Sequence, residues 1–152
     1  MNKNPLDVFI EGAKKGFNIA VFSLLPNVLM AYVIAKMLTI LGIMQLLAKI
    51  FSPIMSLFSL PGESIAVLLS AWLSVSAGVG MLISLISDNL LNDVQISIIT
   101  PAIFLMGAQL QYMGRLLGVA GVRKKYWPLL MLTSILNAFI AMGFLAFYFK
   151  IS

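Results

Sequence analysis

The sequence contains no cysteine and no histidine among its 152 residues. Disulfides, thiolate zinc sites and cysteine nucleophiles are therefore excluded, and so is imidazole acid–base chemistry. Serine has no histidine partner anywhere in the chain, which leaves a serine–lysine arrangement as the open route to a serine nucleophile. We therefore expect no enzymatic activity, no metal site and no cofactor.

Charge is also scarce. The acidic residues are Asp7, Glu11, Glu63, Asp88 and Asp93, and no two of them form an obvious paired-carboxylate site. Only 10% of the chain is charged, against roughly 25% in soluble domains, and 61% is hydrophobic. The net charge of +5 comes from Lys and Arg at the ends of apolar segments, which is typical of membrane topology rather than of nucleic-acid binding.

This composition predicts one all-α polytopic membrane domain over residues 1–152, with room for about three to five spans of ~20 residues. Residues 5–16 have an amphipathic pattern that predicts a short helix lying on the membrane surface. Residues 17–35 and 37–51 predict membrane helices, the first kinked at its central proline and the second marginally short. Residues 127–149, with aromatic residues at both ends, predict the final span.

Two further segments combine apolar character with helix-breaking or polar residues. Residues 64–87 carry two stripes of small residues, and either a continuous helix with two packing faces or a re-entrant hairpin breaking near residues 75–80 accounts for them. The hairpin arms would each be about ten residues long. Residues 96–113 predict a helix broken at Pro101, with Gly107 and two glutamines crowded near its end.

The distribution of positive charge predicts how the chain is oriented in the membrane. The basic residues near the N-terminus and in the loop at 115–126 place both in the cytoplasm, while the loop at 88–95 has no positive charge and faces outside. The C-terminus then also lies outside. Either 17–35, 37–51 and 64–87 all cross the membrane, or the first is one long bent crossing and 64–87 is a hairpin.

Polar groups at membrane depth are the candidate site, since lipid offers them no hydrogen bonds. For each of them a packing, interface or topology role stands beside substrate contact. The candidates for substrate contact are Ser74, Ser76, Gly78, Gln109, Gln111, Asn27 and Arg115. Glu63, directly before an apolar run, is a candidate for ion coupling, or it stabilises the positive end of that helix.

Several motifs together resemble a known family: LLPNV at 24–28, LPGE at 60–63, and the block PAIFLMGAQLQYMGRLLGVAGVRKKYWP at 101–128. The chain resembles the YjiG type of small bacterial inner-membrane proteins. That type is similar to the spore-maturation B proteins and to the nucleoside-recognition "gate" domains. The resemblance implies one repeat of a fold like that of the concentrative nucleoside transporters, with broken helices, and a second gate-domain chain as partner.

The resulting functional hypothesis is an inner-membrane subunit of a secondary transporter that moves a small polar solute. Its partners would be the lipid bilayer and a second gate-domain chain, or a second copy of this chain. The alternative is a structural or regulatory scaffold with no solute pathway of its own. Nothing in the sequence identifies the solute or the coupling ion.

Overall fold

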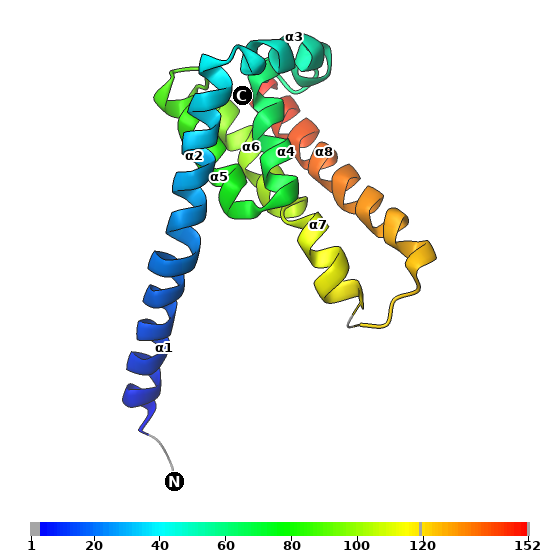
Figure 1. The fold of residues 1–152 in the computed structure, drawn as a ribbon. Coiled ribbons are helices and arrows are strands. Elements are labelled where there is room, and N and C mark those ends of the chain that lie inside the picture. Colours follow the sequence, from blue (N-terminus) through cyan, green and yellow to red (C-terminus); the bar gives the residue numbers. More distant parts are fainter. Residues whose placement is uncertain (1–3, 119, 152) are drawn as a thin grey trace.

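The computed structural model describes residues 4–118 and 120–151, and every regular element in these ranges is a helix, as the sequence predicts. Figure 1 shows a body of packed helices from which two long arms extend. The elements are α1 Pro5–Ile19, the π-helical turn η1 Ala20–Leu24, α2 Leu25–Ile40, α3 Ile43–Ser56, η2 Gly62–Ser64, α4 Ile65–Leu73, α5 Val75–Ser87, α6 Asp93–Leu105, α7 Gln109–Tyr112, η3 Met113–Leu117, η4 Lys124–Tyr126 and α8 Trp127–Ile151.

The first arm is a single helix made of α1, η1 and α2. Asn4 begins it by accepting the N–H of Leu6 at 3.2 Å, and Pro5 occupies its first turn. Instead of a separate surface helix at 5–16, the chain runs unbroken for 36 residues to Ile40. Pro26 does not end the helix, because Leu25 donates its N–H to the carbonyl of Ala20 and so widens one turn ahead of the proline.

Gly42, with a φ of 74°, turns the chain from α2 into α3, which lies across one end of the molecule (Figure 1). The structure extends α3 to Ser56, so that Pro53 lies inside the helix rather than at its end. α3 then packs on η2. A Cβ on Gly62 would lie 2.2 Å from the carbonyl oxygen of Ala48, so this close approach requires glycine.

The segment at 64–87 consists of two short helices, α4 and α5, separated by Ser74 in an extended conformation (φ −162°, ψ 131°). The chain reverses at Ser74 and the two helices lie side by side (Figure 1). A Cβ on Gly78 would lie 2.6 Å from the Cβ of Ala71. The small residues therefore permit close packing between α4 and α5, which together form a hairpin.

The next helix, α6, begins with a capping box between Asn92 and Gln95 and continues through Pro101 to Leu105. It breaks at residues 106–108 rather than at the proline, and Ala108 adopts a left-handed conformation with φ 56°. The core lies where α4, α5, α6 and α8 meet. Its fully buried side chains include Val67, Leu85, Ile98, Ile99, Ile103 and Met142.

Within the described residues, two helices are long and apolar enough to cross a membrane, Pro5–Ile40 and Lys124–Ile151. The start of α1 and the loop before η4 lie at one end of the molecule, whereas α3 and the end of α8 lie at the other (Figure 1). Near this second end, Lys36 of α2 forms an ion pair with Asp88, which follows α5.

Candidate functional site

The two helix interruptions meet in space, and their contacts form the candidate site. The N–H of Ala108 donates to the carbonyl of Ala71 at 2.7 Å. The side-chain amide of Gln111 donates to the carbonyl of Leu73 at 3.0 Å. Both acceptors belong to the last turn of α4, whose carbonyls lack partners within the helix. The break between α6 and α7 therefore caps the end of α4.

Gly107 brings the two breaks together. A Cβ at this position would lie 2.4 Å from Cγ2 of Val75 and 2.3 Å from the carbonyl oxygen of Ile103. Any larger residue would force the first turn of α5 away from the end of α6. The break occurs at this glycine because two helices share the space that a side chain would otherwise fill.

Gln109 is buried, with 8% of its surface exposed, and it links three helices. Its Oε1 accepts a hydrogen bond from Nε1 of Trp72 at 2.8 Å, and its Nε2 lies 3.4 Å from the carbonyl of Met131. An amide side chain has two N–H donors and two acceptor positions on oxygen. Gln109 thus holds α4, α7 and α8 together, with one donor and one acceptor position not used by these contacts.

Ser74 and Ser76 lie at the turn of the hairpin, where their hydroxyl oxygens are 3.0 Å apart. Both residues are half-buried. Ser76 also lines a cleft of about 270 Å³, together with Val28, Val79 and Phe104. It therefore supplies a polar group to an otherwise apolar cleft between α2, α5 and α6.

A second cleft, also of about 270 Å³, separates the α7–η3 segment from α8. Gln109 and Ser134 line its inner end, where the hydroxyl of Ser134 donates to the carbonyl of Leu105 at 2.5 Å. Among the described contacts at the two breaks, all partners are amides, hydroxyls, an indole or backbone groups, and none is charged. The arrangement suits hydrogen bonding to an uncharged polar group.

Of the predicted candidates, the structure brings Ser74, Ser76, Gln109 and Gln111 to one place. Gly78 is buried between α4 and α5, where it serves close packing. Glu63 is in η2, at the other end of α4, about 16 Å along the helix from Ser74 at ~1.5 Å per residue. The side chains of Asn27 and Arg115 lie outside the described part of the structure.

Trp72 and the backbone N–H of Ala108 are among the contributors to the site that were not predicted from the sequence. Trp72 carries an indole N–H that needs a partner in apolar surroundings, and this requirement was a usable signal. The backbone N–H of Ala108 had no such signal, because its availability depends on the left-handed turn. In the part of the chain that the structure describes, no cluster of acidic side chains is placed to hold a metal ion.

Comparisons with known proteins identify relatives of this chain. A family model described as Gate, nucleoside recognition, matches residues 21–120, which include both interruptions. The inner membrane protein YjiG of Escherichia coli strain K12 is 41% identical over 141 residues, covering 93% of this chain and 92% of YjiG. The protein MJ0880 of Methanocaldococcus jannaschii is 33% identical over 93 residues, covering 61% of this chain and 30% of that protein. No solved structure matches.

Proposed function

The chain belongs to the Gate family of nucleoside-recognition membrane proteins, and from this premise we propose that it is a subunit of a secondary transporter moving a small polar solute across the bacterial inner membrane. The location follows the name of the Escherichia coli relative, an inner membrane protein. The transport role rests on the geometry of the two breaks.

The observation that carries this proposal is the meeting of two interrupted helices inside an apolar helical body. Non-helical backbone at membrane depth leaves N–H and C=O groups without partners, which is tolerated where protein or a water-filled cavity surrounds them. Broken helices around a site at the bilayer midplane occur in many secondary transporters. Ser74, Ser76, Gln109 and Gln111 are the residues that we assign to solute contact, through hydrogen bonds to uncharged polar groups.

In this proposal, Pro5–Ile40 and α8 cross the membrane and α4–α5 forms a re-entrant hairpin. The N-terminus and the loop before η4 face the cytoplasm, because they carry most of the positive charge, and the C-terminus faces outside. Gly78 serves packing within the hairpin. Glu63, one helix length from the breaks, stabilises the start of α4 and takes no part in coupling.

The proposed partner is a second gate-domain chain, with a second copy of this chain as the other possibility. Gln111 and Tyr112 are exposed, and the half-buried Ser76 opens into an apolar cleft. In lipid such polar groups would cost several kcal/mol each when left without partners. A partner chain seated over the breaks would enclose them and complete a site that one chain leaves open.

One observation favours a different function, that of a membrane scaffold without a solute pathway. The Trp72–Gln109–Met131 hydrogen bonds are satisfied within the chain and hold three helices together. A purely structural role needs nothing more. The two functions differ in whether water reaches the hairpin turn.

Cysteine labelling tests the proposal directly, because the chain has no native cysteine. Ser74→Cys and Ser76→Cys are treated in intact membranes with a charged, water-soluble methanethiosulfonate reagent. Leu69→Cys and Ile83→Cys are matched controls from the exposed faces of the same hairpin arms. We expect the serine positions to react at least about tenfold faster, since thiolate reaction requires water. Equal rates at all four positions would rule out a solute pathway here and leave the scaffold.

A further inference from the structure

The outer half of the cleft between η3 and α8 is apolar and open. Its walls are Met113, Leu116 and Leu117 on one side and Leu130 and Met131 on the other. α6 packs along α8, whereas the α7–η3 segment diverges from it toward the connecting loop (Figure 1). The cleft therefore widens from the polar inner end at Gln109 toward the loop.

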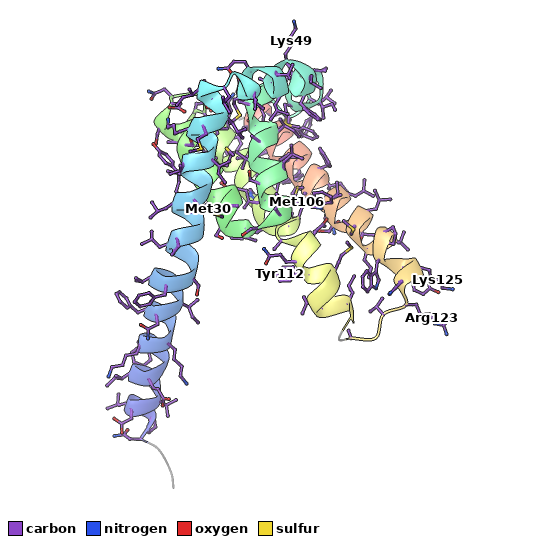
Figure 2. The ribbon with its side chains drawn as sticks, in the orientation of Figure 1. Met30, Lys49, Met106, Tyr112, Arg123 and Lys125 are labelled. Carbon is purple, nitrogen blue, oxygen red and sulfur yellow. The ribbon has the colours of Figure 1, made fainter. Side chains whose placement is uncertain are left out.

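Three successive basic residues lie in the segment that connects η3 with α8, on the side toward which this cleft opens. Arg123, Lys124 and Lys125 are exposed, and Figure 2 shows Arg123 and Lys125 extending from the loop before α8. Neither of the described ion pairs involves them, and no acidic residue follows Asp93 in the sequence. The basic loop thus has no negative partner from its own half of the chain.

The loop is held at the level of an aromatic belt. The indole N–H of Trp127 donates to the carbonyl of Val122 at 3.0 Å, which ties the loop to the first turn of α8. Nζ of Lys125 lies 4.8 Å from the centre of the Tyr126 ring. Trp and Tyr at the end of an apolar helix mark the headgroup level of a bilayer. With α8 crossing the membrane as proposed above, the three cations lie at the level of the lipid phosphates.

We propose that this cleft binds one anionic phospholipid, with its phosphate at Arg123, Lys124 and Lys125 and an acyl chain between Leu117 and Leu130. The charge of the loop selects an anionic headgroup, and the apolar walls accept the chain. The lipid fills the wedge between η3 and α8 and supports their separation. This binding is independent of the transport role, since it uses the outer half of the cleft and none of the residues at the helix breaks.

The first test is native mass spectrometry of the full chain in mild detergent with added phosphatidylglycerol or phosphatidylcholine. We expect phosphatidylglycerol to remain bound and phosphatidylcholine to be lost. Replacing Lys124 and Lys125 by Gln should weaken phosphatidylglycerol binding about thirtyfold, at about 1 kcal/mol per basic residue near a membrane surface. The matched control, Lys14→Gln with Lys15→Gln, removes the same charge from α1 and should leave binding within about twofold.

A second pair of variants tests the apolar part of the site at constant charge. Leu117→Trp fills the cleft and should reduce phosphatidylglycerol binding at least about tenfold. Leu129→Trp places the same side chain on the exposed surface of α8, outside the cleft, and should not. The loop variant keeps the test decisive even where a cleft variant fails to fold, because its positions are exposed.

Three results would overturn the proposal. Equal retention of phosphatidylglycerol and phosphatidylcholine would mean that the charge of the headgroup does not determine which lipid binds. An equal loss in the α1 control would indicate general attraction of anionic lipid to a basic protein. Cross-linking of Leu117→Cys to another protein chain in native membranes would show that a subunit, and not lipid, occupies the cleft.

Discussion

The long helix Pro5–Ile40 and the hairpin formed by α4 and α5 differ in where the helix continues and where it breaks. The long helix contains Pro26 and continues through it. The hairpin contains no proline and breaks at Ser74. α3 and α6 also continue through prolines, and α6 breaks five residues after Pro101. At the break after α4, tertiary contacts receive the freed backbone groups, whereas none of these prolines ends its helix.

The difference lies in what surrounds each point. Around Pro26, the side chains of Phe22, Ser23 and Leu25 are exposed, as is Pro26 itself, although α2 packs on α5 farther along. No described hydrogen bond joins this turn to another helix, so no neighbour offers hydrogen bonds in exchange for a break. At Ser74, the α6–α7 break supplies the N–H of Ala108 and the amide of Gln111 to the last turn of α4. Five substitutions probe this contrast, and their expected effects decrease from Gly107→Ala to Ser84→Ala.

Gly107→Ala should have the largest effect. Its Cβ would lie within 2.4 Å of both Val75 and the Ile103 carbonyl, so one of the two breaks must move. We expect the free energy of unfolding to fall by about 3 kcal/mol, measured by titration with SDS in mixed micelles. The control is Gly16→Ala on α1, where no atom lies within 4 Å and alanine favours the helix. Similar stability in both variants would mean that the breaks do not depend on close approach.

Gln109→Leu comes next. It leaves the indole N–H of Trp72 and the carbonyl of Met131 without their partner in an apolar environment. We expect a loss of about 2 kcal/mol in the same titration. Gln45→Leu on the exposed face of α3 is the matched control and should change stability by less than about 0.5 kcal/mol. A neutral result for Gln109→Leu would exclude this network as the link between α4, α7 and α8.

Gln111→Leu removes one cap from the end of α4. Because Gln111 is exposed and only one hydrogen bond is lost, we expect a loss of about 1 kcal/mol. The sharper measurement is hydrogen exchange at the N–H of Ser74, which should accelerate as the last turn of α4 frays. Unchanged exchange there would show that Ala108 alone caps the helix.

Pro26→Ala should change stability by less than about 1 kcal/mol, although a proline within a helix generally costs about 3 kcal/mol. The widened turn at Ala20–Leu24 already accommodates the ring, so alanine recovers little. Circular dichroism should show the same helix content in both proteins. A gain near 3 kcal/mol would mean that the proline is a strained site after all.

Ser84→Ala should have the smallest effect. The hydroxyls of Ser64 and Ser84 are buried and have no hydrogen-bond partner among the described residues. Removing one of them forfeits no described hydrogen bond and relieves its desolvation, so stability should stay within about 0.5 kcal/mol or rise. A loss above about 1 kcal/mol would indicate that the hydroxyl binds a water or another group inside the hairpin.

Much of the fold was predictable from composition and pattern. The all-helical membrane character and the family resemblance are both confirmed. The second helix interruption was expected at Pro101, but it lies at residues 106–108, because Val75 occupies the space beside Gly107. The predicted surface helix at 5–16 is the first part of a continuous helix, because the turn ahead of Pro26 keeps its hydrogen bonding.

The candidate site was predictable in its side chains but not in its geometry. Polar residues in apolar runs, such as Ser74 and Gln109, are visible in any sequence because each needs a hydrogen-bond partner. The partners themselves were not visible. The carbonyls of Ala71, Leu73 and Met131 look the same in sequence as every other backbone group.

The sequence by itself determined that this protein belongs in a membrane, that it is helical and which polar residues need hydrogen-bond partners. These properties are local, because hydrophobicity and hydrogen-bonding capacity belong to individual side chains. The tertiary structure alone decided where the helices break and which groups meet. A break requires new partners for freed backbone groups, and those partners lie more than thirty residues away along the chain, from Ala71 to Ala108. Only folding brings them within reach.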